Sequence, residues 1–511
     1  MSDRPHLLLR ADGGPRTGIG HLMRCLALGQ AWQDRGGTGV LVSAAIPPAL
    51  EARFHAEGIE RIPMPHEPGS EEDAELVARE AAARQAVVAL DGYRFEPGYQ
   101  TSVTRGARSL LLVADHGRPR PGAVDVLLDQ NLDAGPQDYP DLPAAARGLF
   151  GPRFALLRRE IRAAACDPVE RRHPPRRLLV TLGGGNDGDL GEELLEVLSG
   201  DPLGLREVTV VAGPAHPSPA RLEGRIRDLP LAGSLVYDPT SMVPLIQRAD
   251  VALAAAGSTC WELACLGLPA VVVAIADNQE PVAAALARRG VALSAGRVGP
   301  KSGENATRGL AHLVGDGELF ETLRERGMLL VDGEGASRVT RSLLGPLLGA
   351  APNELTLRPA TLTDARLLWR WVNDPDVRAA SFRSAPIPWL EHRRWLAGRL
   401  TDPGTRIYVA LDGAGEPVGQ IRFEVEGETA NVDVSVEPAA RGGGLGTGLI
   451  RAGCERFFRE RGTQRVRARV KVGNRASLGA FRRAGFASLG TGTHRGQTTE
   501  TFELVKERRH A

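Results

Sequence analysis

A glycine-rich segment over residues 13–20, which includes Gly18 and Gly20, runs directly into His21 and Arg24. Small residues between a strand and a helix let the backbone approach a ligand, and free N–H groups at the helix start favour an anion. His21 and Arg24 are three residues apart, so they share one face of the predicted helix. A histidine beside a bound diphosphate is suited to general acid–base catalysis. A plain phosphate-binding turn that begins a helix accounts for the same residues, and the pattern leaves both interpretations open.

A second polar segment follows a predicted strand, and it comprises Gly257, Ser258, Thr259 and Glu262. Ser258 and Thr259 are typical of a helix start, where N–H groups and hydroxyls can bind a diphosphate. Glu262 lies one turn inside that helix, where it can accept hydrogen bonds from a ribose diol or complete a capping box. Asn278 and Gln279 follow the next predicted strand and can bind sugar hydroxyls at the same sheet edge.

The sequence R-G-G-G-L-G-T-G at residues 441–448 lies between a predicted strand and a predicted helix. Successive backbone N–H groups in such a loop form a nest for a pyrophosphate at a helix N-terminus. A dinucleotide-binding fold is disfavoured because the preceding strands form a meander and not a strand–helix–strand unit. Downstream, residues 470–486 predict a strand, a cap at Asn474 and an amphipathic helix that ends at Gly485.

The elements that must position these residues fall into three blocks, separated by connectors predicted at residues 171–177 and 345–354. The first connector has two prolines and no apolar residue, which indicates an exposed segment. The predicted domains are therefore 1–170, 171–345 and 354–507, in agreement with roughly 150 residues per domain.

The first two blocks alternate apolar strands with helices. In the first block the predicted strands are 7–10, 40–44, 86–90 and 109–114, and the predicted helices are 22–35 and 48–57. In the second block the predicted strands are 177–182, 208–211, 235–237, 251–254 and 270–273, and the predicted helices are 190–198, 242–248, 260–266 and 280–289. Such patterns indicate α/β halves with parallel sheets covered on both faces, and a cleft between them at the carboxyl ends of the strands.

The third block is predicted to be an α+β module. Residues 405–412, 416–426 and 430–437 are consecutive strand candidates joined by short turns. In the last of them, Val432, Val434 and Val436 alternate with polar residues, which is typical of a half-buried strand. An antiparallel meander therefore leads into the glycine-rich loop and its helix.

Length, charge and cysteine content exclude several classes of protein. The chain has 511 residues, with 63 Lys and Arg against 62 Asp and Glu and a net charge of +1. That balance disfavours a chain-wide nucleic-acid or membrane surface, so neither is an expected partner. The five cysteines show no C-x-x-C pair and no zinc spacing. The apolar runs are short, so we expect neither a signal peptide nor a membrane span. We therefore expect a cytoplasmic protein without a metal, and the sequence leaves its oligomeric state open.

The chain from about Leu7 to Leu344 resembles the UDP-sugar hydrolases of pseudaminic acid biosynthesis, which are relatives of the MurG-like glycosyltransferases. The matching pieces, in order, are R-A-D-G-G-P-R-T-G-I-G-H-L-M-R-C (10–25), D-G-Y (91–93), Asp115, Q-N (130–131), G-P-R-F-A-L-L-R-R-E (151–160), L-G-G-G (182–185), A-G-S-T-C-W-E (256–262) and N-Q (278–279). Their order and spacing are more specific than any single piece. The resemblance implies two Rossmann-like lobes of the glycosyltransferase-B type, a UDP-sugar substrate and no metal.

The same resemblance implies roles for individual residues. Hydrolysis of the anomeric C–O bond is expected to depend on His21, which would activate water for inverting attack. The second lobe is expected to bind UDP through Ser258, Thr259 and Glu262. Further UDP-sugar contacts are expected at Gly18, Gly20, Arg24, Tyr93, Asn131, Gly257, Asn278 and Gln279.

The sequence departs from this family pattern at three places. His116 stands where many relatives have a second Asp, and Asp129 stands where the usual residue is Asn. Gly185 and Asn186 loosen the L-G-G-x-D pattern before Asp187. These departures bear on the exact sugar more than on the reaction class.

Residues 358–486 resemble the GCN5-related N-acetyltransferases (GNAT), which use acetyl-CoA as the acetyl donor. The family's R-x-x-G-x-G loop and its N-x-x-S…F-x-x-x-G-F segment imply a CoA-binding set of Arg441, Gly442, Gly444, Gly446, Thr447, Gly448, Asn474, Ser477 and Phe481. The segments R-W-V-N-D-P-D-V-R (370–378) and H-R-R-W (392–395) are similar to the subfamily that acetylates amino groups on nucleotide-linked sugars.

In this family an amine attacks the thioester directly, so a base must remove a proton from the ammonium. Glu424 and Asp433, on adjacent predicted strands, are the candidates, and the choice between them stays open. The Tyr that commonly protonates the leaving thiolate corresponds here to Phe481, which cannot donate a proton. Either another group or solvent protonates CoA, or the domain binds CoA without turnover.

The two resemblances support each other. In the pseudaminic acid route an acetyltransferase adds an N-acetyl group to a UDP-4-amino sugar, and the hydrolase then removes UDP from that product. We therefore predict a bifunctional enzyme whose partners are two small molecules, a UDP-amino-sugar and acetyl-CoA. The alternatives are a MurG-like glycosyltransferase that moves the sugar to an acceptor, and a sensor or scaffold whose sites bind without turnover.

Overall fold

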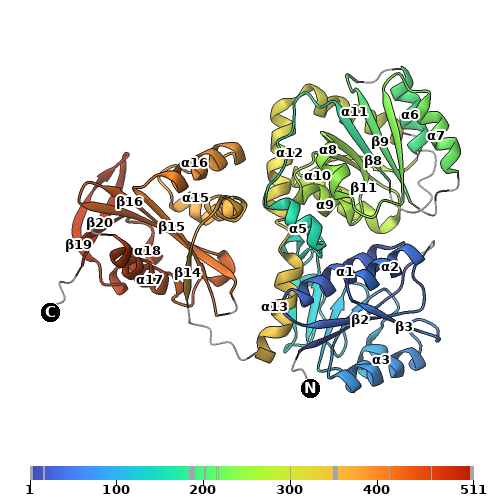
Figure 1. Cartoon of the computed structure of the whole chain (residues 1–511), viewed down its shortest axis with the longest axis horizontal. Coiled ribbons are helices and arrows are strands. Elements are labelled where there is room, and N and C mark those ends of the chain that lie inside the picture. The colour runs from blue at the N-terminus through green and yellow to red at the C-terminus, as the bar shows by residue number, and fades with distance from the viewer. Residues whose placement is uncertain are drawn as a thin grey trace. The chain divides into compact units, whose positions relative to one another are not determined.

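The computed structural model of the chain describes residues 4–14, 18–182, 190–200, 203–213, 216, 218–299, 301–348, 355–413, 415–461 and 463–506 (Figure 1). It contains two compact units, Met1–Leu347 and Leu348–Ala511. Of the segments singled out above, Gly183–Gly185 and the departures at Gly185 and Asn186 lie outside the described residues. The second predicted connector is described only as far as Leu348.

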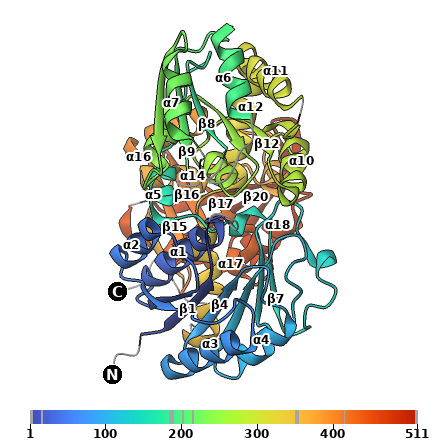
Figure 2. The same cartoon turned by 90° about the vertical axis from the view of Figure 1, so that its right-hand side faces the viewer.

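The first unit begins with a sheet of seven parallel strands in the order β3-β2-β1-β4-β5-β6-β7. Its strands are β1 His6–Ala11, β2 Thr38–Ser43, β3 Glu60–Pro63, β4 Val87–Asp91, β5 Ser109–Val113, β6 Val126–Asp129 and β7 Arg147–Phe150. Its helices are α1 Gly20–Gln33, α2 Pro48–Ala56, α3 Glu71–Arg84 and α4 Pro97–Thr104. Helices α1 and α2 pack on one face and α3 and α4 on the other (Figure 1, Figure 2), which is why the central strands are apolar on both faces.

The second sheet of this unit has six parallel strands in the order β10-β9-β8-β11-β12-β13. Its strands are β8 Arg177–Thr181, β9 Glu207–Ala212, β10 Ala232–Tyr237, β11 Val251–Ala255, β12 Ala270–Ala274 and β13 Leu293–Arg297. Its helices are α6 Leu190–Gly200, α7 Pro219–Arg227, α8 Val243–Arg248, α9 Thr259–Cys265, α10 Glu280–Arg288, α11 Ser302–Gly315 and α12 Gly317–Leu330. Both strand orders reverse beside the first strand of their sheet, so the unit consists of two Rossmann-like lobes, as the sequence predicts.

Two helices cross between the lobes. Helix α5 (Arg159–Ala165) follows the first sheet in the chain, but its Ile161 and Ala165 pack in the core beside α9 and β12 of the second lobe. Helix α13 (Gly335–Leu348) follows the second sheet, but its Val339 and Leu343 pack in the core beside β1 and α1 of the first (Figure 1). The core of the second lobe therefore includes α5, which follows the first sheet in the chain, and the core of the first lobe includes α13, which follows the second sheet.

The connector at residues 171–177 is not uniformly exposed, contrary to the expectation from its composition. Arg171 is buried, and its guanidinium donates to the carbonyl oxygens of Ile246, Ala249, Leu266 and Gly267. These carbonyls belong to the last turns and the C-terminal ends of α8 and α9, which have no partners within their own helices. The composition of the segment cannot predict these contacts, because the four carbonyl groups lie 75 to 96 residues further along the chain.

The second unit is built on a mixed sheet in the order β14-β15-β16-β17-β18-β20-β19. Its strands are β14 Thr356–Pro359, β15 Thr405–Leu411, β16 Pro417–Glu426, β17 Thr429–Val436, β18 Arg465–Lys471, β19 Ala487–His494 and β20 Gln497–Val505. Its helices are α14 Ala365–Val372, α15 Pro375–Ala380, α16 Trp389–Thr401, α17 Leu445–Glu460 and α18 Arg475–Arg483. The predicted meander is the β15-β16-β17 run, which is antiparallel throughout.

Strands β17 and β18 pair only at their beginnings. The parallel register joins residues 429–431 to residues 465–467, and the remainder of β17 has no partner on that side among the described residues. The two strands therefore diverge towards their carboxyl ends, where the loop at 441–448 begins α17. In the part of the chain that the structure describes, no helix is long and apolar enough to cross a membrane.

Replacing Arg171 by Met is expected to lower the free energy of unfolding by about 3 kcal/mol, because four buried carbonyl groups lose their donor. Urea denaturation followed by circular dichroism measures the loss. The neighbouring Arg172, which is exposed, supplies the control, and Arg172→Met should change stability by less than about 0.5 kcal/mol. An equal effect of both substitutions would contradict a structural role for the Arg171 contacts.

Candidate functional site

His21 and Asp91 meet at the carboxyl edge of the first sheet. His21 is the second residue of α1, and Asp91 is the last residue of β4, the parallel neighbour of β1. The His21 Nδ1 atom lies 2.6 Å from Asp91 Oδ1. Asp91 also accepts two N–H groups of Arg24, and Arg24 Nη2 lies 2.9 Å from the same Nδ1 atom. In the neutral tautomer that carries its proton on Nδ1, His21 donates to Asp91, and its Nε2 atom keeps a lone pair that can accept a proton from a ligand or water.

Arg24 is 8% exposed and lies between two carboxylates. Its Nε and Nη2 atoms are 2.8 and 2.6 Å from the oxygens of Asp91, and its Nη1 is 3.0 Å from Asp115. Burial alone would raise the pKa of Asp115, but the charge of Arg24 and its hydrogen bonds outweigh burial and lower that pKa to about 2. The same pairing holds the pKa of Arg24 well above its usual value in spite of burial.

Tyr93 and Asn131 extend this cluster. The Tyr93 hydroxyl donates to Asp115 over 3.2 Å, and the Tyr93 ring packs edge-on against the ring of His21 at 5.2 Å. Burial and the charge of Asp115 raise the pKa of Tyr93 to about 12, so the hydroxyl stays protonated. Asn131 donates to Asp115 over 3.2 Å and thus belongs to the same group of side chains.

Asp129 is a buried acceptor beside this cluster. It accepts hydrogen bonds from the Tyr139 hydroxyl at 2.7 Å, from Asn131 Nδ2 at 2.8 Å and from the backbone N–H of His116 at 3.1 Å. Burial, which these hydrogen bonds do not fully offset, raises its pKa. His116 is exposed and has a left-handed backbone with φ of 51°. Asp129 therefore stabilises the turn at residues 115–117 through its hydrogen bond with the N–H of His116.

The second lobe brings its own helix start to this edge. Ser258 immediately precedes α9 and its side chain caps no backbone group, and Thr259 is the first helical residue. A Cβ atom placed on Gly20 would lie 3.9 Å from Ser258 Oγ, so the beginnings of α1 and α9 face each other. Gly18 precedes α1 in a left-handed conformation with φ of 70°, and it pairs with Gly14 through two backbone hydrogen bonds.

Glu262 is a buried acidic residue, and only one of its two carboxyl oxygens has a partner within the protein. It is 7% exposed, and its Oε1 lies 3.0 Å from Arg158 Nη1, but Oε2 is buried and has no hydrogen-bond partner. Burial raises the pKa of Glu262 more than Arg158 lowers it. The capping-box alternative is not formed, because Ser258 makes no side-chain cap. Oε2 is therefore a buried polar atom to which no protein group is hydrogen-bonded.

Asn278 and Gln279 lie in the turn that follows β12. Asn278 Nδ2 is 3.4 Å from the Tyr93 hydroxyl, which links the second lobe to the cluster in the first. Gln279 accepts the backbone N–H of Ile275 at 3.1 Å, and its Nε2 is 3.6 Å from where a Cβ on Gly257 would be. All the residues predicted for the UDP-sugar site therefore occupy the facing edges of the two lobes.

Sequence reasoning assigned no role to three residues that organise this site. Asp91, Asp115 and Arg158 each contact a predicted site residue and were not themselves predicted to be site residues. Asp91 ends β4 and Asp115 follows β5, so carboxylates at the ends of neighbouring buried strands were the available signal. Arg158 precedes α5, and its pairing with Glu262 depends on the crossing of that helix between lobes.

In the second unit, the loop at 441–448 has the geometry of an anion nest. Gly442 and Gly444 have φ of 92° and 82°, conformations that favour glycine, and Gly444 precedes the first residue of α17. Gly446, Thr447 and Gly448 form the first turn of the helix, and the buried hydroxyl of Thr447 has no hydrogen-bond partner. The loop thus presents backbone N–H groups and one unused hydroxyl.

The other residues of the predicted CoA set serve local structure. Asn474 caps α18 by accepting the backbone N–H of Ser477 at 3.1 Å. Phe481 is 3% exposed, and its ring contacts Phe486 and Phe502 in the core. Arg441 donates to Asp374 and Asp376, at 2.7 and 2.8 Å.

Glu424 and Asp433 lie on one face of the sheet with Arg422. Arg422 stands opposite Asp433 in the register of β16 and β17, and its side chain is 3.2 Å from Glu424 and 3.9 Å from Asp433. Glu424 is also 3.5 Å from Arg399. Asp433 has the longer ion pair and the more exposed side chain of the two.

His392 is a further group near this face. It is buried on α16 and its ring packs against Trp395, over which Arg422 lies at 5.0 Å. Burial lowers the pKa of His392 to about 4, so its imidazole is neutral near pH 7, and its Nε2 atom has no hydrogen-bond partner. The H-R-R-W segment contained this residue, but its burial was not visible in the sequence.

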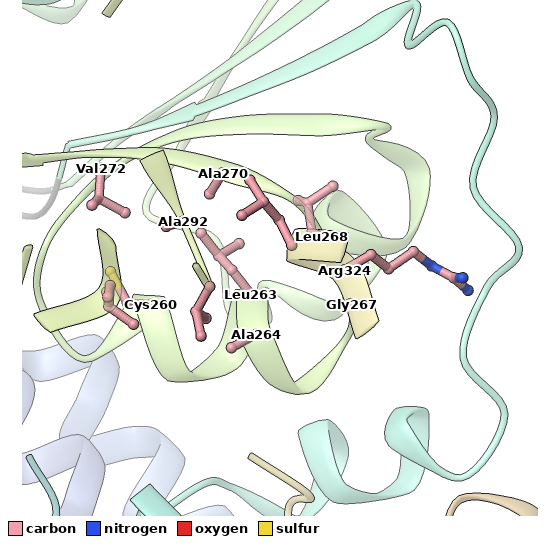
Figure 3. Close-up of a pocket in the computed structure, with 12 residues that line it drawn as sticks. Cys260, Leu263, Ala264, Gly267, Leu268, Ala270, Val272, Ala292 and Arg324 are labelled. Carbon is pink, nitrogen blue, oxygen red and sulfur yellow. The ribbon is translucent and has the colours of Figure 1, made fainter. Parts of the chain in front are cut away.

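One pocket lies inside the second lobe, away from these groups (Figure 3). Apolar side chains of α9 and β12 line it, including Leu263, Ala270 and Val272, and the guanidinium of Arg324 points away from it. No predicted site residue lines this pocket. Among the described residues, no group of three or more His, Cys, Asp or Glu side chains is arranged to hold a metal ion.

Comparison with known proteins separates the two units. An acetyltransferase (GNAT) domain family model matches residues 354–487. An L-methionine sulfoximine/L-methionine sulfone acetyltransferase of Pseudomonas paraeruginosa is 34% identical over 117 residues, which are 22% of this chain and 67% of that protein. The second unit therefore belongs to the GNAT acetyltransferases.

The larger part of the chain has a distant homologue. The spore coat polysaccharide biosynthesis protein SpsG of Bacillus subtilis is 25% identical over 342 residues, which are 66% of this chain and 97% of that protein. The chain thus joins a homologue of a polysaccharide biosynthesis protein to a GNAT domain.

Solved acetyltransferases also align with the chain. Spermidine N-acetyltransferase of Vibrio cholerae, in complex with CoA and spermine, is 18% identical with a TM-score of 0.28, over 30% of this chain and 95% of that one. An aminoglycoside acetyltransferase in complex with coenzyme A is 22% identical with a TM-score of 0.27, over 30% of this chain and 95% of that one.

Stability on acidification is expected to depend on Asp115. Its pKa falls from 3.8 to about 2 on folding, so its ionised form stabilises the fold above about pH 4, and this contribution is lost as pH falls through about 2. Between pH 5 and pH 2, Asp115→Asn should lose about 2 kcal/mol less unfolding free energy than the unsubstituted protein. Urea denaturation at a series of pH values measures both slopes. Asp141→Asn, at an exposed carboxyl, should keep the original slope.

Proposed function

We propose that the chain is a bifunctional cytoplasmic enzyme of nucleotide-sugar metabolism. Its second unit would transfer an acetyl group from acetyl-CoA to the amine of a UDP-4-amino-4,6-dideoxy-sugar. Its first unit would hydrolyse the resulting UDP-2,4-diacetamido-2,4,6-trideoxy-β-L-altropyranose to UDP and the free sugar, as in pseudaminic acid biosynthesis. The presence of a GNAT domain on the same chain as a homologue of a polysaccharide biosynthesis protein supports this pairing.

The observation that carries the hydrolase half is the contact between His21 and Asp91. With the proton on Nδ1 and Asp91 held by Arg24, the free Nε2 of His21 takes a proton from water as the water oxygen bonds to the anomeric carbon. The bond from that carbon to the UDP oxygen breaks, UDP leaves with the electron pair, and the configuration inverts. Asp91 stabilises the imidazolium that forms.

The same arrangement supports binding of UDP between the lobes. The beginnings of α1 and α9, with Gly18, Gly20, Ser258 and Thr259, supply N–H groups and hydroxyls for the diphosphate. The unpartnered Oε2 of Glu262 would accept from the ribose diol. Tyr93, Asn131, Asn278 and Gln279 would then surround the sugar.

For acetyl transfer, the sugar amine attacks the thioester carbonyl, and the C–S bond of acetyl-CoA breaks. The loop at 441–448 would hold the CoA pyrophosphate through its N–H groups. Asp433, whose ion pair with Arg422 is the longer, is the better placed of the two candidates to accept the ammonium proton, through water. Phe481 is in the core and gives no proton to the thiolate, so solvent would supply it.

Replacing His21 by Ala is expected to lower UDP release about a thousandfold, the usual range for loss of a general base, while the Kd for UDP changes by less than about threefold. Turnover is measured as free UDP, and binding by calorimetry. His55→Ala, an exposed histidine on α2, should leave both unchanged. Undiminished release by the His21 variant would overturn the assignment, and a parent protein that binds UDP but releases none from any substrate would favour the sensor.

Incubation of the purified chain with acetyl-CoA and UDP-4-amino-4,6-dideoxy-β-L-AltNAc is expected to yield CoA, UDP and the free diacetamido sugar, detected by mass spectrometry. The His21→Ala variant should instead accumulate the N-acetylated UDP-sugar, because only the first unit is disabled. Release of neither CoA nor UDP would refute the proposal. Release of UDP that requires an added acceptor would favour a glycosyltransferase.

A further inference from the structure

The arginine that opens the glycine-rich loop of the second unit is already bound to protein groups. Arg441 directs Nη1 to Asp376 Oδ2 at 2.8 Å, Nη2 to Asp374 Oδ1 at 2.7 Å and Nε to the carbonyl oxygen of Val436 at 3.2 Å. Each nitrogen of the guanidinium thus has an acceptor. These contacts use three of its five N–H groups, so the protein itself fixes the orientation of the guanidinium.

The two aspartates lie at the beginning of α15, a short helix that is fixed at both ends. Asp374 caps α15 by accepting the backbone N–H of Val377 at 3.2 Å, and it uses the same oxygen to bind Arg441. The other end of α15 receives a hydrogen bond from Lys471 Nζ to the carbonyl oxygen of Ala379, at 3.0 Å.

The anchoring groups come from the two strands that diverge. Arg441 follows the end of β17, and Lys471 is the last residue of β18. The two strands pair only at residues 429–431 and 465–467, so no sheet hydrogen bond is present to fix their separation at these ends. Just beyond α15, the ring of Phe382 packs edge-on against His494, the last residue of β19, at 4.8 Å. Helix α15 therefore bridges the open end of the sheet.

We infer that Asp374 and Asp376 are positioning residues for the CoA loop: through Arg441 they hold residues 441–448 in the conformation that binds a pyrophosphate by backbone N–H groups. This inference rests on the proposed use of acetyl-CoA. The glycines at 442 and 444 make the loop conformationally free, and such freedom must be removed before binding. The ion pairs with α15 remove it in the absence of a ligand.

A second role for Arg441 makes the opposite prediction. If its guanidinium is itself a phosphate ligand, the two aspartates compete with CoA, and their neutralisation must strengthen CoA binding. If Arg441 positions the loop, their neutralisation must weaken it. The sign of the change in affinity therefore distinguishes the two roles.

The experiment is calorimetric titration of the full chain with CoA alone, which requires no acceptor and no turnover. Asp374→Asn with Asp376→Asn keeps the shape of both side chains and the cap of α15 but removes both charges, and we expect a Kd about tenfold higher. Arg441→Gln should raise the Kd by about the same factor. Combining all three substitutions should add nothing further, because they break one interaction.

Neutralising two carboxylates also removes their long-range repulsion of an anionic ligand, and salt screens this repulsion. Titrations at about 0.15 M and about 0.5 M salt separate it from a change in the loop. Hydrogen exchange of the 441–448 amides in the free protein is a second readout, and these amides should exchange faster in the double variant. Glu460→Gln, which breaks the ion pair with Arg456 at the opposite end of α17, should alter neither quantity.

An unchanged or lower Kd for the double variant at both salt concentrations, with unchanged exchange in the loop, would overturn the inference. A parent chain that does not bind CoA would instead refute the proposed use of acetyl-CoA, and the inference with it. Thermal unfolding of each variant identifies any that fails to fold. Asp376→Asn alone is the safeguard, because its side chain is 87% exposed and it caps no helix, and it should raise the Kd by a smaller factor.

Discussion

The first unit depends on one buried guanidinium, that of Arg24, which lies between the carboxylates of Asp91 and Asp115. An unpaired charge at this depth would be destabilising by several kcal/mol, and pairing with two carboxylates from neighbouring strands removes most of that cost. The proposed chemistry depends on the same group, because the Asp91 carboxyl that accepts from Arg24 also contacts His21 Nδ1. A shift of α1, which carries both His21 and Arg24, would therefore disturb the buried ion pairs and the contact proposed for catalysis together.

The second unit also contains an arginine that is paired with two aspartates, but the pairing has a different consequence there. Arg441 is also held by two aspartates, but near the surface, and the group that it orders is a glycine-rich loop and not an imidazole. In both units the arginine contacts protein carboxylates, and the proposed anionic ligands would be bound by backbone N–H groups at helix starts. A chain with 63 basic and 62 acidic residues can therefore be suited to two nucleotides without a strongly basic surface.

The crossing of α5 and α13 explains how the two lobes form one site. Helix α5 carries Arg158 at its beginning into contact with Glu262, and α13 returns the chain to the core of the first lobe. Each crossing helix packs in the core of a lobe, so the edges that hold His21 and Ser258 are positioned by packing as well as by polar contacts such as that between Asn278 and Tyr93. The boundary predicted at residue 345 places most of α13 with the second lobe, because this helix follows the second sheet in the sequence. In the structure, α13 packs in the core of the first lobe.

The sequence by itself determined the fold class, the alternation of strands and helices that gives parallel sheets, and the GNAT module. Apolar periodicity, glycine-rich turns and ordered motifs are local signals, and a single sequence displays them. It also predicts site residues at His21, Glu262 and the 441–448 loop, and these stay predictions. Only the tertiary structure decided which groups act on them: Asp91 on His21, Arg158 on Glu262, and Asp374 with Asp376 on Arg441. Each of these partners lies between about 65 and 105 residues away in the chain, and side-chain pairing over such separations depends on sheet order and helix crossing, which no local pattern encodes.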